Sequence, residues 1–249
     1  MKKIKILALL QARTSSSRLS DKVLRDILGA PMLLRQIERE NLVKSIDHLV
    51  VVTSSDKSDD LLSEVLHEND IDYYRGSLND VLDRFYQAAK LYKPEHVVRL
   101  TGDCPLVDPE VVENVIKMHI DTNADYTSNI FPATYPDGLD VEVMKFSALE
   151  IAWKESELPS EREDVTPLIR NDKERFLHSN LEYSCDLSSY RWTVDEAQDL
   201  EFVKKVYEKL YKENPAFNMN DIINYLDTNP ELAKLNAHFV RNEGSVKSF

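Results

Sequence analysis

Three basic side chains surround a short run of serines near the amino terminus of this 249-residue sequence. Arg13, Arg18 and Lys22 bracket the serines at positions 15–17, and an apolar run comes directly before them. A loop of this kind can turn backbone N–H groups inward while fixed cations neutralise a polyphosphate. The loop lacks the G-x-x-x-x-G-K-[ST] pattern of a P-loop, so it is a different solution to the same problem. The alternative is an exposed basic loop after an ordinary first strand.

Two carboxylates further along the chain suit a metal ion that faces such phosphates. Asp103 follows an apolar run in a turn that Gly102 and Pro105 shape, and Asp195 follows a second apolar run. Carboxylate oxygens bind Mg²⁺, and phosphate oxygens commonly complete its ligands. Each carboxylate also has an ordinary alternative, because Asp is frequent in turns and at helix N-caps. Asp195 could cap a helix that begins near Gln198.

The elements that must position these residues alternate along the first half of the chain. Apolar runs predict strands at 4–10, 48–53, 72–75 and 97–101, and helical spacing predicts helices at 31–43, 59–69, 81–92 and 109–120. This alternation indicates an α/β fold with a doubly wound, mostly parallel sheet. Ligands of such sheets bind beyond the carboxyl ends of the strands, which is where Arg13 and Asp103 fall.

The alternation changes after residue 125. The pattern then predicts a short strand at 126–130, a helix at 146–157, a return to the sheet near 191–195, a helix at 200–210 and a helical tail at 221–235. We interpret residues 130–190, with their loop residues and dense charge, as an excursion from the sheet that forms a lid or an oligomerisation arm. The whole chain, 1–249, is then a single domain that carries this excursion.

The composition limits the kind of partner. The sequence has 31 basic and 44 acidic side chains and a net charge of −13, which argues against a nucleic acid or an anionic membrane as partner. Its two cysteines, Cys104 and Cys185, form no metal-binding pattern, as expected for a reduced compartment. The apolar run near the amino terminus is too short to span a membrane and lacks a signal-peptide pattern. We therefore expect a cytoplasmic protein.

Several motifs together resemble those of sugar-activating nucleotidyltransferases. Residues 11–22 with 28–32 resemble their entry loop, 101–106 resembles their metal loop, and 192–195 with 199–200 resembles their second acidic motif. The sequence is most similar to the cytidylyltransferase family of CMP-ketodeoxyoctonate and CMP-sialic acid synthetases. Within that family the spore-coat polysaccharide SpsF-like branch fits best, through residues 75–77, 80–84, 135–140, 159–163 and 236–238. The resemblance implies a nucleotide-diphospho-sugar transferase-like fold.

The resemblance also implies roles for individual residues. Arg13, Lys22 and Asp103 would be catalytic, and Asp103 and Asp195 would bind Mg²⁺. Nucleotide contacts would come from Gln11, Ala12, Arg13, Ser15, Ser16, Ser17, Arg18, Lys22, Arg75, Ser77, Asp80, Thr101 and Gly102. Arg75 and Ser77 would lie near the cytosine. For the acceptor we expect contacts from Tyr135, Asp140, Glu142, Arg162 and Arg191.

The implied activity is CTP-dependent activation of a small acidic sugar, with a homodimer as the assembled form. An acceptor hydroxyl attacks the α-phosphate in line, and pyrophosphate leaves, so that positioning and charge neutralisation do most of the work. The preferred acceptor is a keto-acid sugar of the nonulosonic type, which gives a CMP-sugar. A phosphorylated acceptor, which gives a CDP-linked product, is the alternative within the same fold, and Arg162, Arg170 and Arg191 suit either a carboxylate or a phosphate.

Two other classes of protein remain to be compared. Glycosyltransferases that use nucleotide sugars usually carry an Asp-x-Asp motif after a strand, whereas Asp70-Ile71-Asp72 comes before one. A non-catalytic nucleotide sensor has no need for two metal-binding carboxylates, so Asp103 and Asp195 argue against that class.

Overall fold

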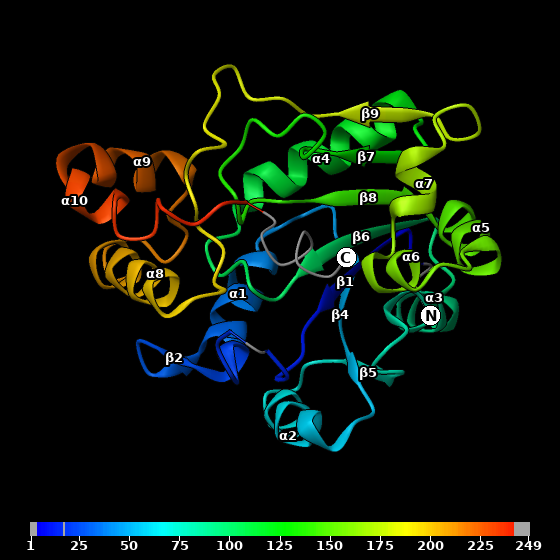
Figure 1. The fold of residues 1–249 in the computed structure, drawn as a ribbon, viewed down its shortest axis with the longest axis horizontal. Helices are drawn as coiled ribbons and strands as arrows, with labels where there is room; N and C mark the ends of the chain where they lie inside the picture. The colour runs from blue at the N-terminus through cyan, green and yellow to red at the C-terminus, as the bar shows by residue number, and fades with distance from the viewer. Residues whose placement is uncertain (1–3, 17, 242–249) are drawn as a thin grey trace.

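The computed structural model describes residues 4–16 and 18–241, and a seven-stranded sheet lies at its centre (Figure 1). In their order across the sheet, the strands are β5 (Tyr73–Gly76), β4 (His48–Ser54), β1 (Ile6–Gln11), β6 (His96–Thr101), β8 (Glu142–Lys145), β7 (Tyr126–Ser128) and β9 (His178–Asn180). Strand β1 pairs in parallel with β4 and β6, β4 with β5, and β7 with β9. Strand β8 runs antiparallel to both of its neighbours. The predicted mostly parallel sheet is confirmed.

Helices cover both faces of this sheet. Helices α1 (Met32–Glu40), α2 (Asp60–Glu68) and α4 (Pro109–Thr122) pack on one face, and α3 (Val81–Tyr92), α5 (Phe146–Glu155) and α7 (Pro167–Asn171) pack on the other. Strand β1 alternates between the two cores, with Ala8 and Leu10 in the first and Leu7 and Leu9 in the second. Because both faces are buried, the strand is apolar at every one of these positions.

Side-chain caps fix where two of the helices begin. Asp80 accepts a hydrogen bond from the Asp83 N–H (2.8 Å) at the start of α3. Asp108 accepts from the Glu110 N–H (2.8 Å) at the start of α4, where Pro109 occupies the first turn. Caps of this kind satisfy N–H groups that have no partner inside the helix. They also hold the preceding loops, which leave from the carboxyl ends of β5 and β6.

The C-terminal helices build a third apolar core beside the sheet. Helices α8 (Ala197–Leu210) and α9 (Met219–Thr228) pack around Trp192 and Ile27, and α10 (Pro230–Ala233) lies against them. Figure 1 shows these helices, in yellow to red, on the side of the molecule opposite α5 and α7. The tail predicted as one helix over 221–235 breaks at Asn229, because Pro230 has no N–H to continue the α9 pattern.

Short elements complete the described chain. They are β2 (Asp26–Ile27), β3 (Ala30–Pro31), the 3₁₀ turns η1 (Lys22–Leu24) and η2 (Lys57–Asp59), and helix α6 (Pro159–Asp164). None of the helices within 4–16 and 18–241 is long and apolar enough to cross a membrane.

Two predictions about the second half of the sheet are wrong. Residues 130–190 do not leave the sheet altogether, since β8 and β9 both come from this range. These strands are only three or four residues long and contain polar residues. Hydrophobic periodicity, which needs a longer run with apolar residues, therefore did not predict them. The sheet also does not resume at 191–195, where a single bridge joins Arg191 to Asp137. The role of 130–190 as a lid or arm stays a prediction.

Candidate active site

Two loops leave the same edge of the sheet side by side. Strands β1 and β6 are parallel neighbours, with Gln11 opposite Thr101 at their carboxyl ends. The Gly102 N–H donates to the Gln11 carbonyl (2.8 Å), which ties the first residue after β6 to the end of β1. The loop that carries Arg13 and the loop that carries Asp103 therefore begin together, as predicted.

Lys22 joins both predicted metal-binding carboxylates. Its Nζ lies 3.1 Å from an oxygen of Asp103, 2.8 Å from an oxygen of Asp195 and 2.9 Å from the carbonyl oxygen of Val194. These groups come from the beginning, the middle and the last quarter of the chain. The structure thus brings together a basic residue of the opening loop and the two carboxylates that the sequence placed opposite it. We call Arg18, Lys22, Asp103 and Asp195 the strand-end site.

Asp195 reaches this site without being the end of a strand. The Val194 N–H and the Thr193 hydroxyl both donate to the Asp103 carbonyl, at 2.8 and 3.2 Å, and so hold the segment against the loop after β6. Asp195 is also not the cap of α8, since the N-cap residue is Glu196. The alternative in which Asp195 serves only as a helix cap is therefore wrong.

The charges of the strand-end site stabilise one another. Burial alone would lower the pKa of Lys22, but Asp103 and then Asp195 outweigh it and raise the pKa. Burial alone would raise the pKa of Asp103, but the Lys22 ammonium and a hydrogen bond from Thr101 lower it to about 2. Asp103 and Lys22 are therefore both charged at neutral pH, as a site for phosphate and metal requires.

Two arginines surround Asp195 on its other sides. Arg18 lies 3.0 Å from Asp195 and 3.5 Å from Glu196. Arg191, only 6% exposed, contacts both oxygens of Asp199 at 2.9 Å and lies 3.3 Å from Asp195. Arg191 was predicted to bind the acceptor, but the structure commits its guanidinium to protein carboxylates. Its contact with Asp195 places it beside the strand-end site, and the acceptor contact of Arg191 stays a prediction.

A second acidic group lies next to this network. Asp137 contacts Arg191 at 3.3 Å, and Asp140 pairs with Arg241. Burial, followed by repulsion from Asp140, raises the pKa of Asp137 to about 7. Gly138 separates the two carboxylates with φ +108°, and a Cβ there would lie 2.5 Å from the Thr193 nitrogen, so only glycine fits.

The backbone of the opening loop is less available than predicted. The Ala12 N–H donates to the Val52 carbonyl (3.2 Å), the Thr14 N–H to the Asp59 carboxylate (2.7 Å), and the Ser16 N–H to the Thr14 carbonyl (2.7 Å). These three amides bond to other groups of the protein. The nucleotide contacts through the loop stay a prediction.

The other predicted nucleotide residues around this edge are placed as follows. Gln11 and Thr101 end β1 and β6, Gly102 begins the next loop, and Ser15 is exposed on the opening loop. Ser17 lies outside the described residues.

The predicted cytosine contacts near β5 have other partners. Arg75 donates to the carbonyls of Ser54 (2.8 Å) and Asp56 (2.9 Å) and to the carboxylate of Asp60 (2.7 Å). The Ser77 hydroxyl accepts from the Asp80 N–H at 3.2 Å. Arg75 therefore binds the loop after β4, which is a structural role.

Asp80 and Arg162 were predicted to contact different substrates, yet they contact each other. Two nitrogens of Arg162 lie 3.0 and 2.6 Å from one oxygen of Asp80. Arg162 also donates to the carbonyl of Trp153 at 2.8 Å. These contacts join α6 and the end of α5 to the first turn of α3. The substrate contacts of Asp80 and Arg162 stay predictions.

Glu142 and Tyr135 also lie inside the fold. Glu142 is 2% exposed and accepts hydrogen bonds from Tyr126 (2.5 Å), Thr166 (2.7 Å) and Arg99. All of these donors come from inside the protein, and the acceptor contact of Glu142 stays a prediction. Tyr135 is 6% exposed.

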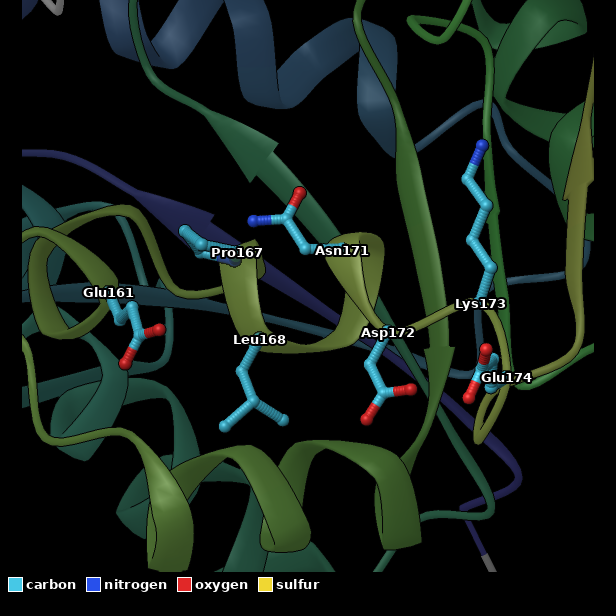
Figure 2. A pocket seen from close by; sticks show the side chains of 7 residues that line it. All are labelled: Glu161, Pro167, Leu168, Asn171, Asp172, Lys173 and Glu174. Carbon is cyan, nitrogen blue, oxygen red and sulfur yellow. The ribbon is translucent and has the colours of Figure 1, made fainter.

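A shallow hollow on another part of the surface does not coincide with these residues. Figure 2 shows it along α6 and α7, where Glu161, Asp172 and Glu174 contribute carboxylates and Leu168 an apolar side chain. Its lining contains none of the predicted site residues, and its acidic character does not suit a triphosphate.

Sequence reasoning missed several members of the network. Asp199 accepts from the N–H groups of Asp195 (3.0 Å) and Glu196 (2.9 Å), and the Asn236 side chain donates to Asp199 (2.9 Å). Asp199, Asn236 and Asp137 stood inside motifs recognised by resemblance, but without a role. The four-residue spacing of Asp195 and Asp199 at the start of a helix was the available signal.

The mostly parallel α/β sheet, with basic and acidic side chains gathered at its strand ends, agrees with the fold of nucleotidyltransferases. Residues 7–230 match the model of the cytidylyltransferase family. The chain belongs to that family and is a nucleotidyltransferase enzyme.

Individual relatives agree with this assignment. The chain is 34% identical to the spore coat polysaccharide biosynthesis protein SpsF of Bacillus subtilis, over 92% of this chain and 96% of that protein. It is similar to the structure of a cytidylyltransferase from Leptospira borgpetersenii, with a TM-score of 0.87, 30% identity, and coverage of 96% of this chain and 98% of that one. The fold is shared with CMP:2-keto-3-deoxy-manno-octonic acid synthetase complexed with CTP, at a TM-score of 0.62 and 17% identity, over 82% of this chain and 99% of that one.

Proposed function

We propose that this enzyme transfers CMP from CTP to a small acidic sugar and releases pyrophosphate. The observation that carries the proposal is the convergence of Lys22, Asp103 and Asp195 at the ends of parallel strands. The name of a fold relative, a CMP:2-keto-3-deoxy-manno-octonic acid synthetase complexed with CTP, supports both the nucleotide and the sugar acid. The SpsF relative supports a place in polysaccharide biosynthesis.

The donor chemistry of the strand-end site fits Mg²⁺ as cofactor. Asp103 is held ionised and offers a hard oxygen ligand, and Asp195 supplies a second carboxylate next to it. Within the described residues, no group of three or more His, Cys, Asp or Glu side chains is placed to hold a metal ion alone. Phosphate oxygens and water would therefore complete the ligands, as is usual for Mg²⁺. When bound, Mg²⁺ neutralises phosphate charge and orients the α-phosphate for in-line attack.

The protein's own cations would act on the same phosphates. Lys22 and Arg18 are held by Asp195, so their donors are fixed before a nucleotide arrives. Fixed donors lower the barrier because they need no reorganisation as charge develops on the leaving pyrophosphate. Lys22 therefore serves in the proposal as the residue that stabilises this charge.

The acceptor would lie beside Asp137 and Asp140. The pKa of Asp137, raised to about 7, suits a group that takes a proton from an attacking hydroxyl at neutral pH. Two acidic groups here disfavour a doubly charged phosphate more than a singly charged carboxylate. Arg162 and Arg170, which suited either a carboxylate or a phosphate, are paired with Asp80 and Asp164 at 2.6 Å and so favour neither acceptor. We therefore favour the sugar acid over a phosphorylated acceptor.

Pyrophosphate release tests the proposal directly. The enzyme is incubated with Mg²⁺, each of the four nucleoside triphosphates, and a panel of keto-deoxy sugar acids and sugar phosphates. We expect release with CTP and at least one sugar acid, and a CMP-linked product by mass spectrometry. Release only with sugar phosphates would replace the proposal with the CDP-linked alternative. Release of CMP or CDP from a ready-made nucleotide sugar, without pyrophosphate, would point to a glycosyltransferase. That outcome is not expected, since Asp70-Ile71-Asp72 precedes β5 at the opposite edge of the sheet.

A further inference from the structure

A buried glutamine of α1 holds the turn that carries Asp103. Gln36 is 0% exposed, and its Nε2 donates to the carbonyl of Thr101 at 2.8 Å. Its Oε1 accepts from the N–H of Cys104 at 3.2 Å. A single side-chain amide, 65 residues before Thr101 in the chain, therefore joins both ends of this turn.

Glu40, one helical turn further along α1, completes the hydrogen bonding of this amide. Its Oε1 accepts from Nε2 of Gln36 at 2.7 Å, so the amide nitrogen serves two acceptors while the amide oxygen serves one donor. A rotated amide would turn its oxygen toward the Thr101 carbonyl and its N–H groups toward the Cys104 N–H, and would lose both bonds. Glu40 is also buried, and burial raises its pKa to about 8, which keeps the carboxyl group largely uncharged at neutral pH.

Bonds from two other parts of the chain meet at the same turn. The Gly102 N–H donates to the Gln11 carbonyl at the end of β1 (2.8 Å). The Asp103 carbonyl accepts from the Val194 N–H (2.8 Å) and from the Thr193 hydroxyl (3.2 Å). The backbone around Asp103 is therefore held from three directions, and the amide from α1 supplies one of them.

The turn also packs closely against its surroundings. A Cβ on Gly102 would lie 3.0 Å from Cβ of Ala12 and 3.0 Å from Cδ1 of Leu33. A shift of the turn toward the opening loop or toward α1 would meet these packed atoms. The hydrogen bonds thus fix a backbone that has one close-fitting position.

The place of the Asp103 carboxylate depends on this backbone. Only two rotatable side-chain bonds separate the carboxylate from its Cα, so a displaced turn would carry the carboxylate with it. One carboxylate oxygen lies 3.1 Å from Nζ of Lys22 in the strand-end site. A functional group of this kind has to be held within about 0.5 Å of its productive position, and bonds to its supporting residues provide that precision.

We propose that Gln36 is a positioning residue, which holds the Asp103 carboxylate where it can serve Mg²⁺ and the phosphates of the nucleotide. Gln36 acts through the backbone of Thr101 and Cys104, and Glu40 keeps its amide in the required orientation. The inference rests on the proposed function for the presence of Mg²⁺ and a nucleotide at Asp103.

Amide hydrogen exchange, followed by NMR on the full chain without ligand, measures the hold on the turn. The Cys104 N–H should exchange slowly in the wild type, since it is bonded to Gln36 inside the protein. Gln36→Met removes the amide at similar volume and should speed the exchange of Cys104 about 5-fold or more relative to the amides of β4, the scale of one hydrogen bond. The matched control is Ile37→Val, which shortens a neighbouring buried side chain of the same helix and should not single out Cys104.

Calorimetric titrations with CTP, in Mg²⁺ and in EDTA, measure the effect on the site. Mg²⁺ should strengthen the binding of CTP to the wild type, and Gln36→Met should lose about 10-fold or more of that gain, the scale seen when a residue that orients a metal ligand is removed. Its affinity for CTP in EDTA should stay within about 2-fold of the wild type. Glu40→Gln should keep the gain, because its side-chain oxygen can still accept from Gln36, whereas Glu40→Leu should lose part of it.

Several outcomes would overturn the proposal. They are equal exchange of Cys104 in the wild type and Gln36→Met, a full Mg²⁺ gain in Gln36→Met, and the same loss in Ile37→Val. If Gln36→Met fails to fold, Glu40→Leu with Glu40→Gln as its control gives the same two comparisons. A wild type that shows no Mg²⁺ gain would overturn the proposed metal site, whereas the exchange rate of Cys104 would still decide whether Gln36 holds the turn.

Discussion

Lys22 occupies the point where carboxylates from two distant parts of the chain meet. Its ammonium lies within 3.1 Å of a carboxylate oxygen of each, and it helps to lower the pKa of Asp103 to about 2. At the residue scale, these ion pairs hold the charged groups of the strand-end site in fixed positions.

We predict that Asp103→Asn and Asp195→Asn each lower turnover by about 10²-fold, the scale seen when one preorganised electrostatic partner is removed. The double variant should lose little more than the worse single one, because groups that act as a unit are not additive. Steady-state pyrophosphate release measures this, with Asp186→Asn as the control, since Asp186 is exposed and accepts hydrogen bonds from Ser188. A fully active Asp195→Asn enzyme would remove Asp195 from the metal site.

At the scale of elements, ion pairs and buried histidines connect helices to the sheet away from the strand-end site. Arg162 links α6 to the start of α3 through Asp80, and His119 of α4 contacts His96 of β6 (3.0 Å) and Thr127 of β7 (3.0 Å). These contacts lie within the scaffold, so their loss should alter stability more than chemistry.

Arg162→Met should destabilise the protein and leave the KM for the acceptor unchanged. Because the change leaves Asp80 without its charged partner, we expect a loss of about 1–3 kcal/mol in the free energy of unfolding. Urea denaturation measures the loss, and the exposed pair of Arg175 with Glu155 supplies the control variant Arg175→Met, which should lose far less. A several-fold rise in the acceptor KM with unchanged stability would restore the acceptor role of Arg162.

His119 should make stability fall in mild acid. Burial, followed by repulsion from His96, lowers the pKa of His119 from 6.5 to about 3. Below pH 6.5 the unfolded chain binds a proton that the folded His119 does not, so stability falls as pH drops toward 3, by up to about 1.4 kcal/mol per pH unit. His119→Gln should flatten the dependence of melting temperature on pH between these limits, whereas His67→Gln, at an exposed position, should not. Parallel curves for His119→Gln and the wild type would contradict this assignment.

At the scale of the whole molecule, the residues between 130 and 190 combine sheet strands with exposed apolar side chains. Phe131, Leu158 and Leu177 are 52%, 59% and 56% exposed. Strands β8 and β9 anchor this range to the sheet, and its loops and short helices carry the exposed residues. Such a segment suits contact with a second copy of the chain.

We predict a homodimer in which this range lies at or near the interface. The mass of one chain is 28.7 kDa. Light scattering at micromolar concentration should give twice this mass. A Leu158→Glu, Leu177→Glu double variant should shift the equilibrium toward monomer, since it places charges where apolar surface is buried. The control is Leu91→Glu, at a site 69% exposed on α3 outside this range. A monomeric wild type would contradict the prediction.

The sequence by itself determined the parallel half of the fold. The apolar runs within β1, β4 and β6, at residues 6–10, 50–52 and 97–98, are buried, and such runs predict strands from the sequence alone. The rule that ligands lie at the carboxyl ends of such strands then placed Arg13 and Asp103 at one edge. The same rule predicted that Lys22 would lie near the two carboxylates, because a site for a phosphate and a metal ion needs both basic and acidic side chains.

Only the tertiary structure decided which polar side chains have partners inside the protein. Asp80, Arg162, Glu142 and Arg75 are charged residues in recognisable motifs, yet each is paired within the scaffold. Arg84 is equally charged in sequence, yet its buried guanidinium has no hydrogen-bond partner among the described residues. Pairing depends on distances between segments far apart in the chain, whereas residue type and spacing report only what each side chain is able to do.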